Sequence, residues 1–347
     1  TIAMDVSLCV RANNSYIFTG LLVNIGRPAK PVNNIPLCRN HLDPQFAFLN
    51  RIAPQQGEAV NQTPRHSPFR VASVQFRSSG HVEQNVARIV DHLRDLSRQG
   101  VCAVAFPECA VTSYDEKAIL ATTPERLSQA EKEIAVACRE NGIGVVVGIP
   151  YWEQGTLYNG ALAFDSGGKC VARYAKIQLA GEKWCAAGAR FAMFSFDSVP
   201  CSVIICHDER YPELVRLPVL AGAQIIFYIS CESDITAETK IAPYRAQIQA
   251  RAMENSVFVV HSNAPMGNVR MRNGKPRGEA AASNGHSRII KPDGNIVAEA
   301  SIWGEDVLVA DLDMSMATRH LALRSLESPL LHSWWEAGLR LVPPPTR

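Results

Sequence analysis

Three short stretches of the chain place a residue suited to acid, base or nucleophilic chemistry directly after an apolar run. In "VAFPECAVTSY" it is Glu108, in "VARYAKIQL" it is Lys176, and in "SVIICHDERYPE" it is Cys206. Ligands of α/β proteins favour the crevice outside the carboxyl ends of strands, so we expect these side chains to meet at one site. Together they supply an acid, an ammonium and a thiol, the set that thiol-based acyl transfer requires.

A thiol is a poor nucleophile until it loses its proton. Its ordinary pKa is about 8.5, so at neutral pH it needs a neighbouring base, and we predict that Glu108 takes the proton of Cys206. Attack on a carbonyl then creates an oxyanion, which the Lys176 ammonium and the backbone N–H of His207 would hold. Such donors contribute roughly 3–4 kcal/mol each in known cases. Taken singly, a capping acid, a surface lysine and a small buried thiol are the ordinary interpretations.

A cysteine–histidine dyad is the competing nucleophile. His207 is adjacent to Cys206, and neighbouring side chains at a strand end tend to point to opposite sides. His261 and His286 stay open as remote partners, although no local cysteine-protease signature surrounds any cysteine. Cysteine and histidine pairs at metal-ligand spacing, such as CxxC or HxxxH, are absent from the sequence. We therefore predict neither a metal nor another cofactor.

The composition is that of an ordinary soluble globular protein, with 47% hydrophobic and 20% charged residues and a formal net charge of +2. Nucleic acid and anionic membrane are poor candidates as partners, because no basic cluster interleaved with aromatics occurs. No apolar run approaches the roughly 18–20 residues that span a bilayer. Ten cysteines without the spacing of a disulfide framework favour a reducing compartment, so we expect a cytoplasmic protein.

The elements that must position these residues follow from hydrophobic periodicity. Residues 1–69 are predicted to form a β-rich or partly irregular extension that ends in a polar linker. From Arg70 onward strands alternate with helices. Near-continuous Val, Ile and Ala strands imply sheets covered on both faces, and hairpin signals exclude a purely parallel sheet. The predicted strands and hairpins are 70–76, 101–106, 143–150, 157–176, 201–206, 224–230, 257–263, 286–300 and 305–313, and the helices are 81–100, 124–142, 212–222 and about 240–255.

The three motifs, in this order, resemble those of the nitrilase superfamily of carbon–nitrogen hydrolases, in its amidase and carbamoylase-like branch. The matching stretches are "FPECAVTSY", "YAKIQL" and "IICHDERYPE". The resemblance implies Glu108 as general base, Lys176 as oxyanion stabiliser and Cys206 as nucleophile. It adds Glu182, in "GEKWCAAG", as an acid that orients Lys176 and the attacking water. Three further motif residues would brace the helix after the nucleophile: Asp208, Arg210 and Glu213.

The resemblance spans residues 70–313 and also implies a fold. This is the four-layer αββα sandwich of the nitrilase type, in which two sheets are faced by helices. Such proteins form homodimers or higher homo-oligomers, so the C-terminal tail at 314–347 is expected to pack at an oligomer interface. The extension at 1–69 lies outside the resemblance, and we hypothesise that it is an interaction module.

The implied reaction is thiol-dependent hydrolysis of a non-peptide C–N bond through a Cys-bound thioester. Nitrilases usually place Trp-Glu after the nucleophile, whereas this chain has His207 and Asp208, so the resemblance favours a small-molecule amide or N-carbamoyl substrate. Nitrile hydrolysis, and a catalytically silent binding protein on the same fold, stay open.

Four residues are candidates for shaping the substrate pocket. Relatives that hydrolyse N-carbamoyl-D-amino acids carry an Arg where this chain has Glu209. At a pocket rim, Glu209 would repel a carboxylate and accept a neutral or cationic substrate; a solvated helix-capping acid is the alternative. The other candidates are aromatic: Tyr114, Trp184 and Phe191.

Overall fold

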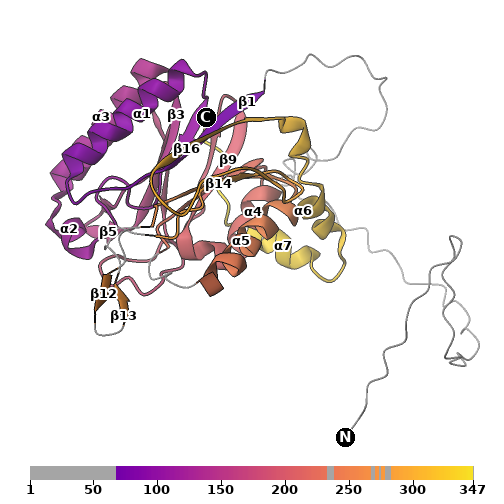
Figure 1. Ribbon diagram of the computed structural model, residues 1–347. Coiled ribbons are helices and arrows are strands. Elements are labelled where there is room, and N and C mark those ends of the chain that lie inside the picture. Colours follow the sequence, from indigo (N-terminus) through magenta and orange to yellow (C-terminus); the bar gives the residue numbers. More distant parts are fainter. Residues whose placement is uncertain (1–67, 233–237, 267–269, 273–274, 278–282, 347) are drawn as a thin grey trace, which may run out of the picture. The chain divides into compact units, whose positions relative to one another are not determined.

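The computed structural model describes residues 68–232, 238–266, 270–272, 275–277 and 283–346 (Figure 1). The chain divides into a unit of residues 1–64 and a unit of residues 65–347, and the described residues all belong to the second. The predicted β-rich extension at 1–69 therefore lies outside the described residues, apart from its last two positions.

Two six-stranded sheets form the centre of the second unit. The first has the strand order β16–β1–β2–β3–β6–β7 and the second β15–β14–β11–β10–β9–β8. Three neighbouring strands run parallel in each sheet, β1, β2 and β3 in the first and β9, β10 and β11 in the second. The remaining pairs in both sheets are antiparallel. The strands of the first sheet are β1 (Phe69–Gln75), β2 (Ala103–Ala105), β3 (Gly144–Gly148), β6 (Gly160–Phe164), β7 (Cys170–Ala175) and β16 (Asp306–Leu312).

The second sheet contains β8 (Met193–Phe196), β9 (Val199–Ile205), β10 (Ile225–Ser230), β11 (Phe258–Asn263), β14 (Arg288–Ile290) and β15 (Ile296–Glu299). Two small hairpins lie outside these sheets. They are formed by β4 (Tyr151–Glu153) with β5 (Thr156–Tyr158), and by β12 (Arg270–Arg272) with β13 (Lys275–Arg277).

Helices cover the outer faces of both sheets, which confirms the predicted αββα sandwich (Figure 1). On the first sheet lie α1 (Val82–Arg98) and α3 (Pro124–Asn141), with the short α2 (Glu116–Ala121) nearby, and on the second lie α4 (Glu213–Leu220), α5 (Glu238–Met253), α6 (His320–Arg324) and α7 (His332–Leu339). The α3 sequence explains its own ends. Thr123 caps it, Pro124 occupies its first turn, and Gly142 adopts the left-handed conformation that ends it.

Three apolar layers hold the sandwich together, and strand alternation assigns side chains to them. In β1, Val71 packs between the two sheets, whereas the next residue, Ala72, packs under α1 and α3. In β10, Phe227 lies between the sheets and Ile226 faces the helices of the second sheet. Strands buried on both faces need apolar residues at every position, which is why they appear in the sequence as continuous runs.

The two sheets are also joined by polar contacts in their middle. Ser73 of β1 donates its hydroxyl to the carbonyl of His261 in β11 at 2.5 Å, and Ser262 of β11 donates to the carbonyl of Val74 at 2.6 Å. Both serines are buried. Small hydroxyl side chains let β1 and β11 approach closely, so these bonds fix how one sheet lies over the other.

The described part of the C-terminal tail packs on its own subunit. Trp335 of α7 is buried among apolar residues of α4, and a Cβ at Gly338 would lie 2.6 Å from Leu217. At the end of the tail, Thr346 donates its N–H to the Met193 carbonyl at 3.2 Å, at the edge of β8. The predicted role of residues 314–347 at an oligomer interface stays a prediction. In the part of the chain that the structure describes, no helix has the length and apolarity to cross a membrane.

Candidate active site

Strand ends of both sheets deliver the three predicted catalytic residues. Glu108 follows β2, and Lys176 directly follows β7 of the same sheet. Cys206 directly follows β9 of the other sheet. Glu108 and Lys176 are buried, and they are the two charged groups that act most strongly on the Cys206 thiol. The structure thus brings the three predicted residues together.

Glu108 is held by three hydrogen bonds. Its Oε1 accepts from Lys176 Nζ at 2.8 Å and from Asn159 Nδ2 at 2.8 Å. Its Oε2 accepts from the backbone N–H of Cys231, just after β10, at 2.8 Å. Because these donors come from both sheets, the carboxyl group has one defined position in the site.

Gly148, at the end of β3, makes room for the backbone that carries Glu108. A Cβ at position 148 would lie 2.1 Å from the Pro107 carbonyl oxygen and 2.7 Å from the Glu108 Cα. No real side chain tolerates such distances, so any residue larger than glycine must displace one of the two segments. Glycine is therefore needed here for close approach.

Lys176 bridges two carboxylates. Its Nζ lies 2.8 Å from Glu108 Oε1 and 2.5 Å from Glu182 Oε1. Burial alone would lower the pKa of Lys176, but a thiolate at Cys206, when it forms, and the carboxylates of Glu108 and Glu182 outweigh burial and raise that pKa well above its usual value. Lys176 therefore stays an ammonium, which suits a donor to an oxyanion and not a base.

Glu182 is fixed from three sides. Besides Lys176, the Tyr114 hydroxyl donates to its Oε1 at 2.8 Å and the backbone N–H of Ala180 donates to its Oε2. Burial opposes ionisation of Glu182, yet the Lys176 charge and these hydrogen bonds hold the pKa of its carboxyl below the ordinary value. The predicted orienting contact between Glu182 and Lys176 is thus present.

Cys206 sits on a sharp turn from strand to 3₁₀ helix. β9 ends at Ile205, a 3₁₀ helix covers Cys206–Arg210, and the φ of Cys206 is 46°. A non-glycine residue in this left-handed region is strained, and such strain is concentrated at functional sites. Burial raises the pKa of the Cys206 thiol well above its ordinary value, and the Glu108 charge raises it further, while Lys176 lowers it. The resting thiol is therefore protonated and needs a base.

Asp208 ties this turn to the lysine strand. Its Oδ2 accepts from the N–H of Ile205 at 3.1 Å and from the Tyr174 hydroxyl at 2.8 Å, and its Oδ1 accepts from the N–H of Gln178 at 2.7 Å. Tyr174 and Gln178 flank Lys176 in the sequence. Asp208 thus connects the turn that carries Cys206 to the segment that carries Lys176, and its predicted bracing of the helix after the nucleophile stays a prediction.

A family model described as carbon-nitrogen hydrolase matches residues 70–320. This chain belongs to the carbon–nitrogen hydrolase family. The match confirms the predicted family, the nitrilase superfamily, and the prediction of an enzyme that hydrolyses a non-peptide C–N bond.

Two curated relatives of this hydrolase and one solved structure illustrate what the chain is similar to. The omega-amidase NIT2 of Xenopus tropicalis is 28% identical over 268 residues, which cover 71% of this chain and 89% of that protein. The 2-oxoglutaramate amidase of Bacillus subtilis (strain 168) is 28% identical over 252 residues, with 71% and 91% covered. An amidase structure from Nesterenkonia sp. AN1, with acrylamide added at its active-site cysteine, superposes with a TM-score of 0.64 at 23% identity and covers 77% of this chain and 99% of that chain. This last likeness shows the shared fold.

The histidines of the hydrolase do not form a dyad with Cys206 in the described part of the chain. The His207 ring lies edge-on to Tyr211 at 5.8 Å, and burial lowers its pKa. His261 is hydrogen-bonded through Nε2 to Ser230 Oγ at 2.8 Å, and His286 lies 3.5 Å from Glu299. The backbone N–H of His207 is in the first turn of the 3₁₀ helix, where amides have no partner within the helix.

Two of the three predicted aromatic residues, Tyr114 and Trp184, lie on the side of the site that contains Lys176. Tyr114 and Trp184 pack on a small apolar cluster that contains Cys109, and the Tyr114 ring centre is 6.0 Å from Lys176 Nζ. Phe191 does not join them. It packs with the helices of the second sheet and lines a separate cavity, so its predicted place in the substrate pocket is wrong.

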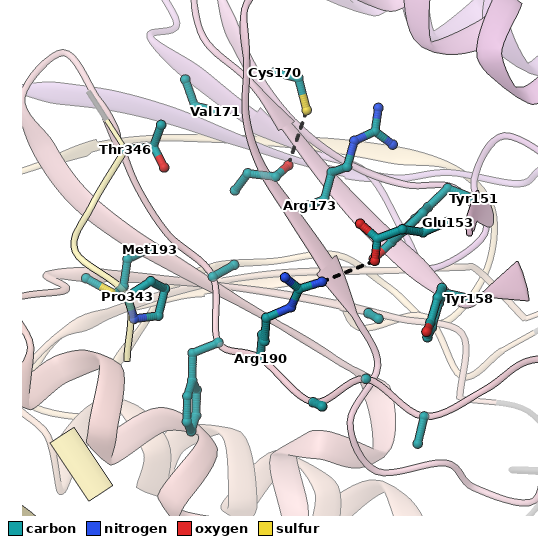
Figure 2. A pocket seen from close by; sticks show the side chains of 17 residues that line it. Tyr151, Glu153, Tyr158, Cys170, Val171, Arg173, Arg190, Met193, Pro343 and Thr346 are labelled. Atoms are coloured by element: carbon teal, nitrogen blue, oxygen red, sulfur yellow. Dashed lines mark hydrogen bonds and ion pairs between the residues drawn. The ribbon is translucent and has the colours of Figure 1, made fainter. Parts of the chain in front are cut away.

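That separate cavity, of about 560 Å³, lies beside the edge strands β7 and β8 (Figure 2). Figure 2 shows Arg190 reaching Glu153 on its wall, with 3.1 Å between Nη2 and Oε2. None of the three catalytic candidates lines it. Arg190, which lines this cavity, is largely exposed to solvent. The cavity is therefore a surface feature, separate from the site that contains Cys206.

Glu209 is not where the sequence interpretation put it. It is fully buried, which rules out a solvated helix cap and an exposed position at a pocket rim, and its role as a substrate-pocket residue stays a prediction. The negative charge that acts most strongly on it is Glu232, which follows β10 by two residues. Glu232 is absent from the predicted site residues, although it has the same sequence signal as Glu108, a carboxylate just after a buried strand. Among the described residues, no group of three or more His, Cys, Asp or Glu is arranged to hold a metal ion.

Proposed function

We propose that this hydrolase cleaves the amide bond of a small molecule through a thioester on Cys206 and releases ammonia or an amine. The observation that carries the proposal is the contact of 2.8 Å between buried Lys176 and Glu108, next to a thiol on a strained turn. An acid that can shuttle a proton and an ammonium that cannot lose one are complementary parts of acyl transfer.

In the first half-reaction, Glu108 accepts the proton of the Cys206 thiol while the sulfur attacks the carbonyl carbon. A C–S bond forms, and the carbonyl electrons move to oxygen, where Lys176 and the His207 N–H stabilise the charge. The intermediate then collapses. Glu108 gives its proton to the nitrogen, the C–N bond breaks, and ammonia or an amine leaves with a thioester remaining on the enzyme.

The second half-reaction uses the same groups with water. Glu108 accepts a proton from water as the oxygen attacks the thioester, and the same donors hold the new oxyanion. The C–S bond breaks, the carboxylic acid leaves, and the proton returns from Glu108 to sulfur. Glu182 keeps Lys176 oriented through both steps, supported by the contact of 2.5 Å between them.

An amide is favoured over an N-carbamoyl compound or a nitrile. The names of the NIT2 omega-amidase, the Bacillus subtilis enzyme and the Nesterenkonia enzyme all denote amidases, which supports the choice. The Cys206-His207-Asp208 order, which differs from the Cys-Trp-Glu order of nitrilases, supports it independently.

A screen of ammonia release tests the proposal. The full chain is incubated with butanamide, N-carbamoyl-β-alanine and butanenitrile, and intact-protein mass spectrometry follows acylation. We expect butanamide turnover and an acyl adduct that Cys206→Ala lacks. Release of ammonia by Cys206→Ala at the parent rate, or an adduct on another residue, would overturn the assignment.

We also propose that the enzyme is a cytoplasmic homodimer or higher homo-oligomer that uses the tail at 314–347 in its interface. The eight cysteines in the described part of the chain are free thiols, which supports a reducing compartment. Leu330 and Trp334 are 86% and 50% exposed on the tail, which supports a partner surface there. Sedimentation of the chain and of a Leu330→Asp/Trp334→Asp variant tests the interface. An unchanged oligomer would contradict it.

A further inference from the structure

Glu209 is an unusual carboxylate for a protein interior. It lies three residues after the nucleophile and is fully buried. Neither of its side-chain oxygens has a hydrogen-bond partner among the described residues. A buried carboxylate without donors is strongly unfavourable, so such a group is rare unless something else pairs with it.

Glu232 is the second member of the pair. It is also buried, and it accepts from the Tyr228 hydroxyl at 3.0 Å and from Asn284 Nδ2 at 2.6 Å. Burial raises the pKa of Glu209 well above its ordinary value, and the Glu232 charge raises it further. Two carboxyl groups in one buried site resist ionising together, so the pair retains a proton when no cation is present.

The backbone places this pair beside the reacting atoms. β9 and β10 are parallel neighbours in which Ile205 lies opposite Ile229, so Cys206 emerges next to the end of β10. The residue before Glu232, Cys231, gives its N–H to Glu108 at 2.8 Å. Glu232 and Glu209 are both among the charges that act on the Cys206 thiol.

The nearby arginines donate to other groups, and in the described part of the chain no ion pair joins any of them to the acid pair. Arg251 donates Nε to the backbone carbonyl of Glu209 at 2.8 Å and Nη1 to the Glu254 carboxylate. Arg210 donates to the Tyr244 hydroxyl, and Arg288 lies 3.3 Å from Glu299 while its buried Nη1 has no hydrogen-bond partner among the described residues. Neither member of the acid pair forms an ion pair with any residue that the structure describes. The pair can therefore accept further hydrogen bonds, because both carboxylate oxygens of Glu209 have no donor among these residues.

We propose that Glu209 and Glu232 form a cation subsite next to Cys206, and that the preferred substrate is a small amide that carries an ammonium group. The inference rests on the proposed amidase function and specifies its substrate class. An ammonium supplies three donors to an acceptor-rich, buried site, and its charge replaces the shared proton. A carboxylate at the same place would be repelled by both acids.

The test compares amides of matched shape. The probes are 4-aminobutanamide, its neutral isostere pentanamide, and the anionic monoamide of succinate. N-(2-aminoethyl)acetamide, which carries the ammonium on the leaving amine, distinguishes the two ends of the substrate. For the parent enzyme we expect kcat/KM for one of the two ammonium amides to exceed that for pentanamide by at least about tenfold, and the anionic amide to be the poorest.

Two isosteric variants, Glu209→Gln and Glu232→Gln, then assign the preference. Each should lower the cationic-to-neutral ratio of kcat/KM by about tenfold or more, mainly through a higher KM for the ammonium amide. Glu125→Gln, an exposed acid on α3, is the matched control and should leave the ratio unchanged. If one variant fails to fold, the other carries the test.

The outcomes separate the two proposals. If pentanamide is hydrolysed without any preference for an ammonium amide, or if both Gln variants keep the parent ratio, the cation subsite is refuted and the amidase function stands. If no amide is hydrolysed and Cys206 is never acylated, the amidase function itself has failed. A preference that is lost in either Gln variant and kept in Glu125→Gln supports the subsite.

Discussion

The Lys176 ammonium lies 2.8 Å from the Glu108 carboxylate, and both side chains are completely buried. A second carboxylate, that of Glu182, approaches the same nitrogen to 2.5 Å. One buried ammonium therefore forms ion pairs with two buried carboxylates. Removing any one of the three groups leaves a buried charge without its full compensation. Stability and chemistry are coupled at this point of the molecule.

Replacing Glu108 by Gln should abolish most turnover without unfolding the protein. Gln keeps an oxygen for the Cys231 N–H but has no carboxyl group to carry a proton. We expect kcat to fall by roughly 10²–10⁴-fold. Steady-state ammonia release with butanamide measures the loss of turnover, and a thermal melt shows whether the variant is still folded. A variant that keeps more than a tenth of the parent kcat would remove Glu108 from the role of base.

Lys176→Met should lose stability as well as activity, because it leaves two carboxylates buried without their cation. The expected loss in free energy of unfolding is about 3–5 kcal/mol, measured by denaturant titration. The double variant Lys176→Met/Glu182→Gln removes one of these anions. It should regain part of the stability and none of the activity. Recovery of turnover in the double variant would contradict the oxyanion role of Lys176.

Gly148→Ala should reduce activity from a position that carries no functional group. The new methyl group would push the Pro107–Glu108 backbone away from β3, which displaces the carboxylate from Lys176. We expect a loss of about 1–3 kcal/mol in unfolding free energy and a lower kcat. Gly80→Ala is the matched control, since a Cβ there would meet only ordinary contact at 4.0 Å. Equal kinetics for the two variants would argue against a positioning role for Gly148.

Asp208 should make the stability depend on pH in the acid range. Burial raises its pKa to about 6 in the folded protein, against 3.8 for an unperturbed aspartate. Between these values the folded state binds more protons than the unfolded chain, so the contribution of Asp208 to the free energy of unfolding falls as pH rises from about 4 to about 6. Denaturant titrations of the parent and Asp208→Asn at pH 4, 5, 6 and 7 measure it. A difference between the two that is constant over this range would contradict the shift.

The sandwich and the three catalytic residues could be predicted because both produce recognisable patterns over a few neighbouring residues of the sequence. Strands buried on two faces produce unbroken apolar runs, and polar residues directly after those runs have no place in a core. Glu108, Lys176 and Cys206 all show that pattern. The helix at 124–142 was equally visible, since its cap, its proline and its terminal glycine are local signals.

Other features depend on how distant segments meet, and no local pattern encodes them. The burial of Glu209 requires the position of β10 relative to the turn after β9. The need for glycine at 148 appears only when the Glu108 loop is placed against β3. The left-handed conformation of Cys206 is imposed by its surroundings, because its intrinsic preference opposes it.

The hydrogen bonds from Ser73 and Ser262 across the sheets have a consequence for the alignment of the catalytic residues. The base and the ammonium belong to one sheet and the nucleophile to the other, so any lateral shear between the sheets changes the reaction distance directly. Ser73 and Ser262 oppose that shear deep in the interior. Two serines that touch no catalytic group therefore help to hold the nucleophile at its working distance from the base and the ammonium.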